Sequence, residues 1–472
     1  MNLIALGPEI IIMTTGLLVL VVDMFIAENK RDAISYVSLS GLFLALIYMA
    51  VFWSKRGIVL GTLQIDDLAM LIRVSIIVAC IMVNLAAIKN TRTIQEHQGE
   101  FFALLLFSVC GAMILTGART LITIYLGLEL STIPMYILVI FRKDMAKAGE
   151  AAIKYFLLGV MSSIFWLYGL TMIFGITGQL ELEGIAKSLS HGFPPIIIIA
   201  SLFCIVGFGF KITLVPFHFW APDTYEGAPL VVVSYLATVL KLGAFVAISR
   251  FFFVGLIATK ANWPLWFGTL AVITMTLGNV MALPQNNIKR MMAYSGISHI
   301  GYPLVAMAVG THASISAMFF YLITYVFSTI GVFFVMYARS TEVDTDDIDG
   351  YTGLSETNPV LAFVMTISFL SLIGLPPFAG FFGKFYILQD AVANGRSWLA
   401  VALLINSVIS FGYYSKVIRA MYLSETKIKK ITGIAVPTNI ALGMATIAII
   451  FLGIAQRPIW QLSLKIFNYL KL

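Results

Sequence analysis

Long apolar stretches recur from one end of the chain to the other, and short polar segments separate them. A helix needs about 20 mainly apolar residues to cross a bilayer, so each stretch predicts one membrane span. About fourteen spans are predicted on this criterion, near residues 3–27, 33–53, 67–88, 101–117, 119–141, 151–176, 195–217, 228–253, 263–283, 288–309, 313–338, 359–390, 398–422 and 434–456. The sequence therefore predicts an all-α polytopic membrane protein, 1–472, with short connections and no appended soluble domain.

Composition supports a lipid environment. The chain of 472 residues is 60% hydrophobic and 11% charged, whereas soluble domains are about half apolar and a quarter charged. A net charge of +7 does not indicate nucleic-acid binding, because the basic residues form no run and no aromatic stripe. Cys80, Cys110 and Cys204 each lie inside an apolar stretch, which predicts neither a metal site nor a disulfide framework. The first apolar run is too long for a signal peptide and is expected to be a retained helix.

The basic residues outside the predicted spans indicate an orientation. An even number of spans places both termini on one side of the membrane. Fourteen basic residues then fall on one side of the membrane and nine on the other, the nine being Lys55, Arg56, Arg119, Lys187, Lys260, Arg396, Arg457, Lys465 and Lys471. Because cytoplasmic loops carry the excess of Lys and Arg, we expect both termini on the outer side of the membrane.

Two predicted spans contain their own breaks. Residues 207–229 read GFGFKITLVPFHFWAPDTYEGAP, and residues 374–385 read GLPPFAGFFGKF. Broken helices are tolerated in membranes where protein or water satisfies the freed backbone, and paired breaks suggest inverted repeats. The breaks lie in the seventh and twelfth spans, so they predict two five-helix repeats of opposite topology, spans 4–8 and 9–13.

These repeats divide the single membrane domain. We expect an N-terminal three-helix segment, a first repeat, a second repeat and a C-terminal helix, with the boundaries 1–100, 101–254, 255–423 and 424–472.

Charged residues inside the spans are the main functional signal. Seven basic residues lie there: Arg73, Lys211, Lys241, Arg250, Lys384, Lys416 and Arg419. Glu129 lies about 15 Å deep in the fifth span, at a cost of a few kcal/mol. It is either a structural carboxylate bonded to a neighbouring helix or the partner of a buried lysine.

Lys211 and Lys241 are too deep for easy snorkelling. Lys211 precedes Pro216 on the broken seventh span, and Lys241 lies about 20 Å along the eighth. Each could form a static ion pair. Alternatively, because burial disfavours a charged ammonium and a neighbouring carboxylate favours it, a moving carboxylate would make the lysine release its proton.

His299 in the tenth span is either a hydrogen-bonded core residue or a proton relay. Histidine titrates near neutral pH, and His299 falls between two lysine-bearing regions, so we expect a relay. Ser295, Ser298 and Tyr302 lie within one turn and could hold water beside it.

Lys384 follows the Pro376-Pro377 break and is the second-repeat counterpart of Lys211. No carboxylate precedes Asp390 in the same apolar stretch. A partner of Lys384 therefore comes from another helix, or the lysine is a terminal exit group.

The remaining charges are expected to matter less. Lys416, Arg419 and Arg250 lie near span ends, where we expect snorkelling. Arg73 has no assigned role. Three residues follow the seventh-span break and either form a proton entry or cap helix ends: His218, Asp223 and Glu226.

Motifs for soluble cofactors are missing. The sequence has no GxGxxG after a strand, no GxxxxGK[ST] and no cysteine cluster for iron–sulfur centres. We therefore expect no NAD, flavin, ATP or iron–sulfur cofactor in this chain, and redox chemistry on another subunit.

The segments around these charges resemble the antiporter-like membrane subunits of respiratory complex I. The segments are GLELSTIPMYIL around Glu129, KYFLLGVMSSIFWLYG at 154–169, the two broken segments, NNIKRMMAYSGISHIGY at 286–302 and SFGYYSKVIRAMY at 410–422. The resemblance implies proton-transfer roles on the fifth, seventh, eighth, tenth and twelfth helices for Glu129, Lys211, Lys241, His299 and Lys384. It also implies quinone reduction on other subunits, with the other complex I membrane subunits, including the paralogous antiporter-like ones, and the bilayer as partners.

Three paralogous subunits share this plan. Lys384, where one paralogue usually has glutamate, and a chain that stops after span 14 favour the N-type subunit. ATVLKLGAF around Lys241 departs from the usual family wording but keeps the lysine. Two alternatives remain, a subunit of a multisubunit sodium/proton antiporter and a scaffold whose buried charges are static pairs.

Overall fold

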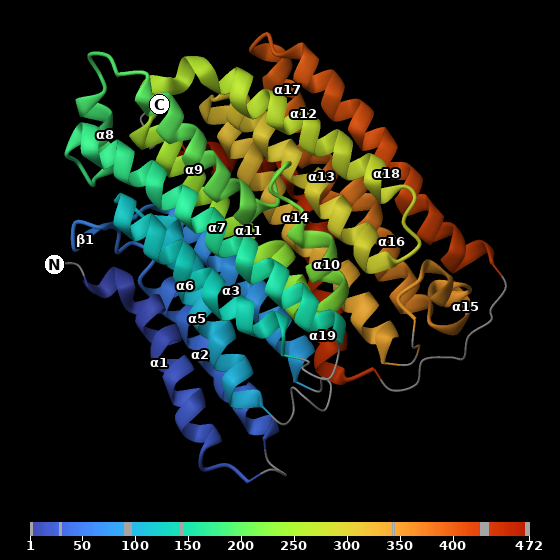
Figure 1. The fold of residues 1–472 in the computed structure, drawn as a ribbon. Coiled ribbons are helices and arrows are strands. Elements are labelled where there is room, and N and C mark those ends of the chain that lie inside the picture. The colour runs from blue at the N-terminus through green and yellow to red at the C-terminus, as the bar shows by residue number, and fades with distance from the viewer. Residues whose placement is uncertain are drawn as a thin grey trace. The chain divides into compact units, whose positions relative to one another are not determined.

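The computed structural model describes residues 3–27, 31–88, 97–141, 146–341, 343, 345–424 and 434–467. This described part is almost entirely helical (Figure 1). A short antiparallel hairpin, β1 (Gly57–Val59) and β2 (Leu63–Ile65), lies in the connection before α3, with Gly57 opposite Ile65. The all-α class predicted from the apolar pattern is therefore confirmed.

Eleven helices in the described residues are long and apolar enough to cross a membrane. The chain is thus a multi-pass membrane protein. The count of fourteen spans stays a prediction, because three predicted spans are not among the eleven. α9 (Ile196–Ile212) and α16 (Pro359–Ile373) are shortened by the breaks that follow them. α13 (Ile288–Val309) carries several polar residues, among them His299.

The chain folds into two compact units. The first comprises the residues up to Ile212 together with Gly227–Ala261. Its helices besides α9 are α1 (Gly7–Asp23), α2 (Asp32–Val51), α3 (Asp67–Ala87), α5 (Gln98–Gly117), α6 (Leu121–Val139), α7 (Ala146–Thr177), α8 (Leu182–Ser188) and α11 (Leu230–Arg250). α11 lies at its centre and is buried over its whole length against α3, α5, α6 and α9.

The second unit comprises Thr213–Glu226 and the residues from Asn262 onward. Its helices besides α13 and α16 are α10 (Trp220–Gly227), α12 (Trp263–Ala282), α14 (His312–Ser340), α15 (Leu354–Thr357), α17 (Ala379–Ala393), α18 (Ser397–Leu423), α19 (Val436–Ile454) and α20 (Gln456–Phe467). α14 is its buried centre and packs against α13, α16, α17, α19 and α20. Helices that are apolar on every side, as α11 and α14 are, belong in the interior of a membrane bundle.

The outer helices keep large apolar side chains exposed. α7 exposes Ile153, Ile164 and Tyr168, and α19 exposes Ile447 and Phe451. Contiguous apolar surface of this kind is typical of contact with lipid or with a partner chain.

Side-chain caps fix where several helices begin. The Asp66 carboxylate accepts a hydrogen bond from the Ala69 amide at the start of α3. Asn287 accepts from the amides of Lys289 and Arg290 at the start of α13. Each cap satisfies amides that the first helical turn leaves without a partner.

Both predicted helix breaks are present. α16 ends at Ile373 because Gly374 takes a left-handed conformation (φ +89°) and Pro376-Pro377 cannot continue the helix. α17 resumes at Ala379. α9 ends at Ile212, and α10 begins at Trp220 beyond Pro216.

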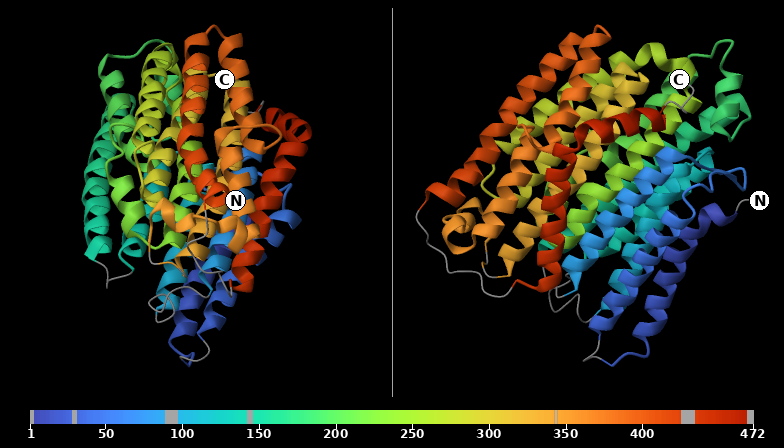
Figure 2. Two further views of the ribbon diagram at one scale, coloured as in Figure 1. Left: turned by 90° about the vertical axis from the view of Figure 1, so that its right-hand side faces the viewer. Right: turned by 180° about the vertical axis from the view of Figure 1, so that it is seen from behind.

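The structure also describes a last helix that the apolar pattern leaves unassigned. α20 turns away from the axis of α19 (Figure 2). The indole ring of Trp460 in α20 stacks on the Tyr386 ring of α17, with ring centroids 4.1 Å apart. α20 therefore packs against α17, the helix that carries Lys384.

Candidate functional site

Glu129 and Lys211 meet inside the first unit. Glu129 projects from α6 and Lys211 from the last turn of α9, and Lys211 Nζ lies 3.9 Å from Glu129 Oε1. This distance exceeds that of a direct hydrogen bond, so the two groups interact by charge across a gap. The ammonium also lies 5.9 Å from the Tyr136 ring centroid, within range of a cation–π contact. The predicted acid–lysine pair is present, and its partners are held loosely.

Ser163 of α7 is a third member of this cluster. Its hydroxyl donates a 2.5 Å hydrogen bond to Glu129 Oε1, the oxygen that faces Lys211. A hydrogen bond to a carboxylate oxygen is short and strong, so it fixes where that oxygen lies. Ser163 is not among the residues predicted from the sequence. The only available signal was its place in the segment KYFLLGVMSSIFWLYG, which contains two adjacent serines.

Lys241 lies at the centre of the first unit. It belongs to α11, the helix that is buried on every side, and only 1% of its surface is exposed. A lysine is almost never fully buried unless it is paired. Its position inside a long apolar helix agrees with the predicted span, and its depth in the membrane and its part in proton transfer stay predictions.

His299 is buried in the second unit between two tyrosine hydroxyls. Its Nδ1 lies 2.6 Å from the hydroxyl oxygen of Tyr321 on α14, and its Nε2 lies 3.0 Å from that of Tyr414 on α18. The Tyr414 hydroxyl in turn is hydrogen-bonded to Ser295, one turn before His299. The sequence predicts polar neighbours for His299 on its own helix. In the structure, α14 and α18 also supply polar neighbours.

Lys384 is held by the break in its own span. Its ammonium donates hydrogen bonds to the carbonyl oxygens of Leu372 (2.9 Å) and Ile373 (3.0 Å), the last residues of α16. It also donates to the Ser407 hydroxyl of α18 at 3.3 Å. The last carbonyls of a helix lack intrahelical partners and carry partial negative charge, so they suit an ammonium group.

The second unit brings Lys384 close to His299. Lys384 Nζ lies 4.3 Å from the ring centroid of Tyr302, and that ring is 5.6 Å from the imidazole of His299, centroid to centroid. The five predicted site residues thus form two groups: Glu129 with Lys211 in the first unit, which also contains Lys241, and His299 with Lys384 in the second.

A family model described as "NADH:quinone oxidoreductase/Mrp antiporter, TM" matches residues 118–410, a range that holds all five of these residues. The chain belongs to this family. The resemblance seen in its motifs is therefore confirmed at the level of the family.

Relatives in this family match nearly the whole chain. NADH-quinone oxidoreductase subunit N of Desulforamulus reducens is 36% identical over 464 residues, covering 98% of this chain and 97% of the relative. The F(420)H(2) dehydrogenase subunit N of Methanosarcina mazei is 35% identical, with 98% and 97% covered.

Solved structures of the family share the fold. A chain of respiratory complex I from Thermus thermophilus with bound aureothin aligns with a TM-score of 0.82 at 28% identity, covering 96% of this chain and 98% of that one. A chain of the Mrp complex from Dietzia aligns at 0.86 with 17% identity, covering 99% and 97%. The fold is thus common to both branches of the family and does not distinguish them.

One prediction for this family member was wrong. Arg250 does not snorkel, because it is only 3% exposed and binds both oxygens of Asp66 at 2.7 Å. It also donates to the Thr116 carbonyl oxygen at 2.8 Å. The physical reason is that α11 is enclosed along its whole length, so its end reaches another helix instead of an interface.

Arg73, which the sequence left without a role, forms a buried ion pair with Glu9 of α1. Its Nε also donates to the Thr116 hydroxyl at 3.1 Å. Thr116 therefore bonds to Arg73 through its side chain and to Arg250 through its carbonyl oxygen. The two arginines fasten α1, α3, α5 and α11 together, which is a structural role.

Asp223 and Glu226 both pair with Arg290. Arg290 Nη1 lies 2.9 Å from an oxygen of each carboxylate, and all three groups are partly exposed. This arrangement anchors α10 to the start of α13. His218 is buried and stacks on Phe219, with centroids 4.6 Å apart, and its role stays a prediction.

The remaining features lie apart from the five predicted site residues. Lys416 and Arg419 are exposed on α18, as snorkelling requires.

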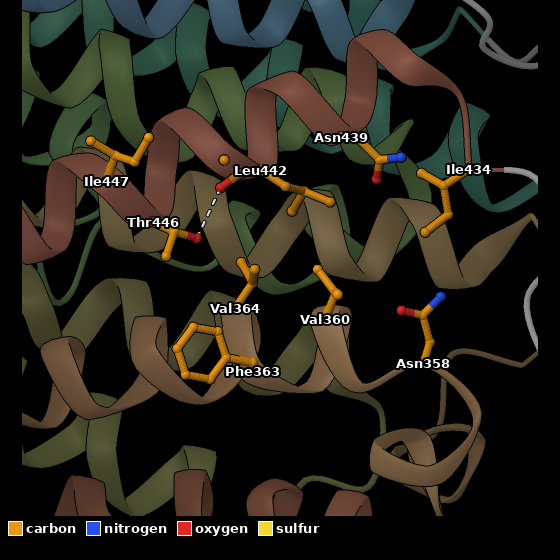
Figure 3. Close-up of a pocket in the computed structure, with 10 residues that line it drawn as sticks. Asn358, Val360, Phe363, Val364, Ile434, Asn439, Leu442, Thr446 and Ile447 are labelled. Atoms are coloured by element: carbon orange, nitrogen blue, oxygen red, sulfur yellow. Dashed lines mark hydrogen bonds between the residues drawn. The ribbon is translucent and has the colours of Figure 1, made fainter.

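A groove of about 680 Å³ lies between α16 and α19 (Figure 3) and is lined mainly by apolar side chains such as Phe363, Leu442 and Ile447. None of the described residues that line it is charged, so we do not assign it to proton transfer.

Proposed function

We propose that this chain is a proton-translocating membrane subunit of an NADH:quinone oxidoreductase, respiratory complex I. The observation that carries the proposal is the 36% identity to a subunit N over 98% of the chain. The buried acid, lysine and histidine groups support it chemically, because titratable groups inside a membrane are typical of proton pathways.

The alternative is a subunit of a multisubunit sodium/proton antiporter. Full-length relatives at 35–37% identity carry the name subunit N, whereas the Mrp chain shares the fold at 17% identity. The sequence relationships therefore favour the respiratory complex. The genes beside this one distinguish the two directly, since quinone-reductase genes support the first assignment and antiporter genes the second.

We propose proton-transfer roles for Glu129, Lys211, Lys241, His299 and Lys384. Protons enter near Lys211 or Lys241, pass His299 and leave by Lys384. The loose contact of Lys211 with Glu129 supports the first part, because a small movement of the carboxylate changes the stability of the ammonium strongly in a dry site.

Lys384 is suited to the last position. Backbone carbonyls stabilise its ammonium without forming a permanent ion pair. A lysine can therefore return to the neutral amine there without leaving a carboxylate unpaired, which a buried ion pair would do at a cost of several kcal/mol.

The proposal includes the setting of the chain. It has fourteen spans with two inverted five-helix repeats, it lies in a bacterial inner membrane, and both termini face outward. The two helix breaks support the repeats, and the distribution of basic residues supports the orientation. NAD, flavin, iron–sulfur clusters and quinone bind other subunits, and the paralogous antiporter-like subunits are its neighbours.

The test is proton pumping by the whole complex in sealed vesicles. Complexes with Lys211→Ala or Lys384→Ala should still assemble and should pump fewer protons for each NADH oxidised. Normal pumping by both variants would refute the proposal. Unchanged pumping after Glu129 and Lys211 are neutralised together would instead support a scaffold with static charges.

A further inference from the structure

Each of the two ring nitrogens of His299 lies at hydrogen-bond distance from one tyrosine hydroxyl. The Tyr321 hydroxyl lies 2.6 Å from Nδ1 and the Tyr414 hydroxyl 3.0 Å from Nε2. The two tyrosines come from α14 and α18, both of which pack against α13. All three side chains are buried, with at most 2% of their surface exposed.

This arrangement suits transfer of a proton across the ring. A neutral imidazole carries N–H at one nitrogen and a lone pair at the other, and a phenol hydroxyl can donate and accept at once. Tyr414 can therefore donate to the bare nitrogen while Tyr321 accepts from the protonated one, or the reverse. Carboxylate partners would instead fix the charge of the imidazole.

The two tyrosines contact different parts of the second unit. Tyr414 is hydrogen-bonded to Ser295 of α13. Tyr321 lies against Gly383, the residue before Lys384, because a Cβ on Gly383 would be 2.9 Å from Tyr321 Cα. Tyr321 therefore lies where α14 contacts α17, the helix that carries Lys384.

We propose that Tyr321 and Tyr414 are proton-transfer residues that carry protons to and from His299. The inference rests on the proposed function and extends it to two residues outside the predicted set. The hydroxyl path runs from Ser295 through Tyr414, His299 and Tyr321.

The transfer is balanced in protons and moves no electrons. The Tyr414 O–H proton bonds to Nε2 as the Ser295 hydroxyl proton bonds to the Tyr414 oxygen, and a water molecule resupplies Ser295. The Nδ1–H proton bonds to the Tyr321 oxygen as the Tyr321 O–H proton passes to a water molecule. One proton arrives, one leaves, and the ring changes from one neutral tautomer to the other.

The test removes each hydroxyl and keeps its ring. Complexes with Tyr321→Phe, Tyr414→Phe and both changes are compared with His299→Ala for protons pumped per NADH oxidised. Each single variant should fall to the level of His299→Ala. Because the groups act in series, the double variant should fall no further.

Tyr325→Phe is the matched control. The Tyr325 ring also lies against His299, with centroids 5.4 Å apart, but its hydroxyl has no hydrogen bond to the imidazole. Pumping should be unchanged in this variant. Equal losses in Tyr325→Phe and the two test variants would mean that the loss reflects packing, and would overturn the inference.

The remaining outcomes separate the two proposals. If His299→Ala abolishes pumping while Tyr321→Phe and Tyr414→Phe pump normally, the inference fails and the proposed function stands. If His299→Ala itself pumps normally, the proposed role of His299 fails. If a tyrosine variant does not assemble, Ser295→Ala carries the test. It removes the hydroxyl bonded to Tyr414 and should lower pumping, and normal pumping would overturn the inference.

Discussion

The Lys384 ammonium donates a 3.0 Å hydrogen bond to the carbonyl oxygen of Ile373, eleven residues earlier and on the far side of the break between α16 and α17. The break therefore both interrupts the helix and supplies the lysine with acceptors. A continuous helix would have used these carbonyls for its own hydrogen bonds. This explains why a buried lysine can persist here with no carboxylate partner among the residues that the structure describes.

Lys384→Arg should abolish most of the pumping attributed to this subunit. Arginine keeps the positive charge but does not release its proton under physiological conditions. Protons pumped per NADH oxidised should fall at least as far as in Lys384→Ala, while blue native electrophoresis shows a full-size complex. Normal pumping by Lys384→Arg would mean that the lysine is only a fixed charge.

Ser163→Ala should slow pumping at least about tenfold, since hydrogen bonds to charged groups contribute about 1.5–3 kcal/mol and about 1.4 kcal/mol is a factor of ten. Without the Ser163 hydroxyl, the Glu129 oxygen that faces Lys211 loses its donor and is held less firmly beside the ammonium. The measurement is the initial rate of vesicle acidification on NADH addition.

Ser162→Ala is the control for that change. The neighbouring Ser162 hydroxyl donates to the Gly207 carbonyl oxygen at 3.2 Å and not to Glu129. This variant should pump at nearly the normal rate. Equal slowing in both variants would assign the effect to the packing of α7.

Arg250→Met should destabilise the subunit without a direct effect on proton transfer. Removing one partner of a buried ion pair costs about 3–5 kcal/mol, and the partial exposure of Asp66 places the cost at the low end. The expected result is a lower thermal midpoint for loss of the subunit from the detergent-solubilised complex. Arg419→Met, which removes an exposed basic residue of α18, should leave that midpoint nearly unchanged.

Gly383→Ala should separate α14 from α17. The added Cβ would lie 2.9–3.0 Å from three atoms of Tyr321, and overpacking of this kind costs about 1–3 kcal/mol. Both stability and pumping should decrease, because the change acts beside Lys384. Gly443→Ala on α19 is the control, since nothing lies within 4 Å of its Cβ position. If the two variants behave alike, close contact at Gly383 is unimportant.

The order of apolar and polar residues determined much of this protein. Spans of apolar residues predicted a helical membrane protein, because a bilayer accepts little else. Proline and glycine predicted both breaks, since each acts on its own backbone. The placing of Glu129, Lys211, Lys241, His299 and Lys384 on helices also followed from their positions along the apolar stretches.

Only the tertiary structure decided the partners of these groups. Tyr414 lies 115 positions after His299, and Asp66 lies 184 positions before Arg250. The spacing of residues along one helix does not identify which other helix packs against that helix. Arg250 was therefore mistaken for a snorkelling residue, and Ser163, Tyr321 and Tyr414 were missed. Whether a residue is buried inside a bundle depends on the helices around it. Only the packing of helices that are distant in the sequence decides which hydroxyl or carbonyl group lies beside a buried charge.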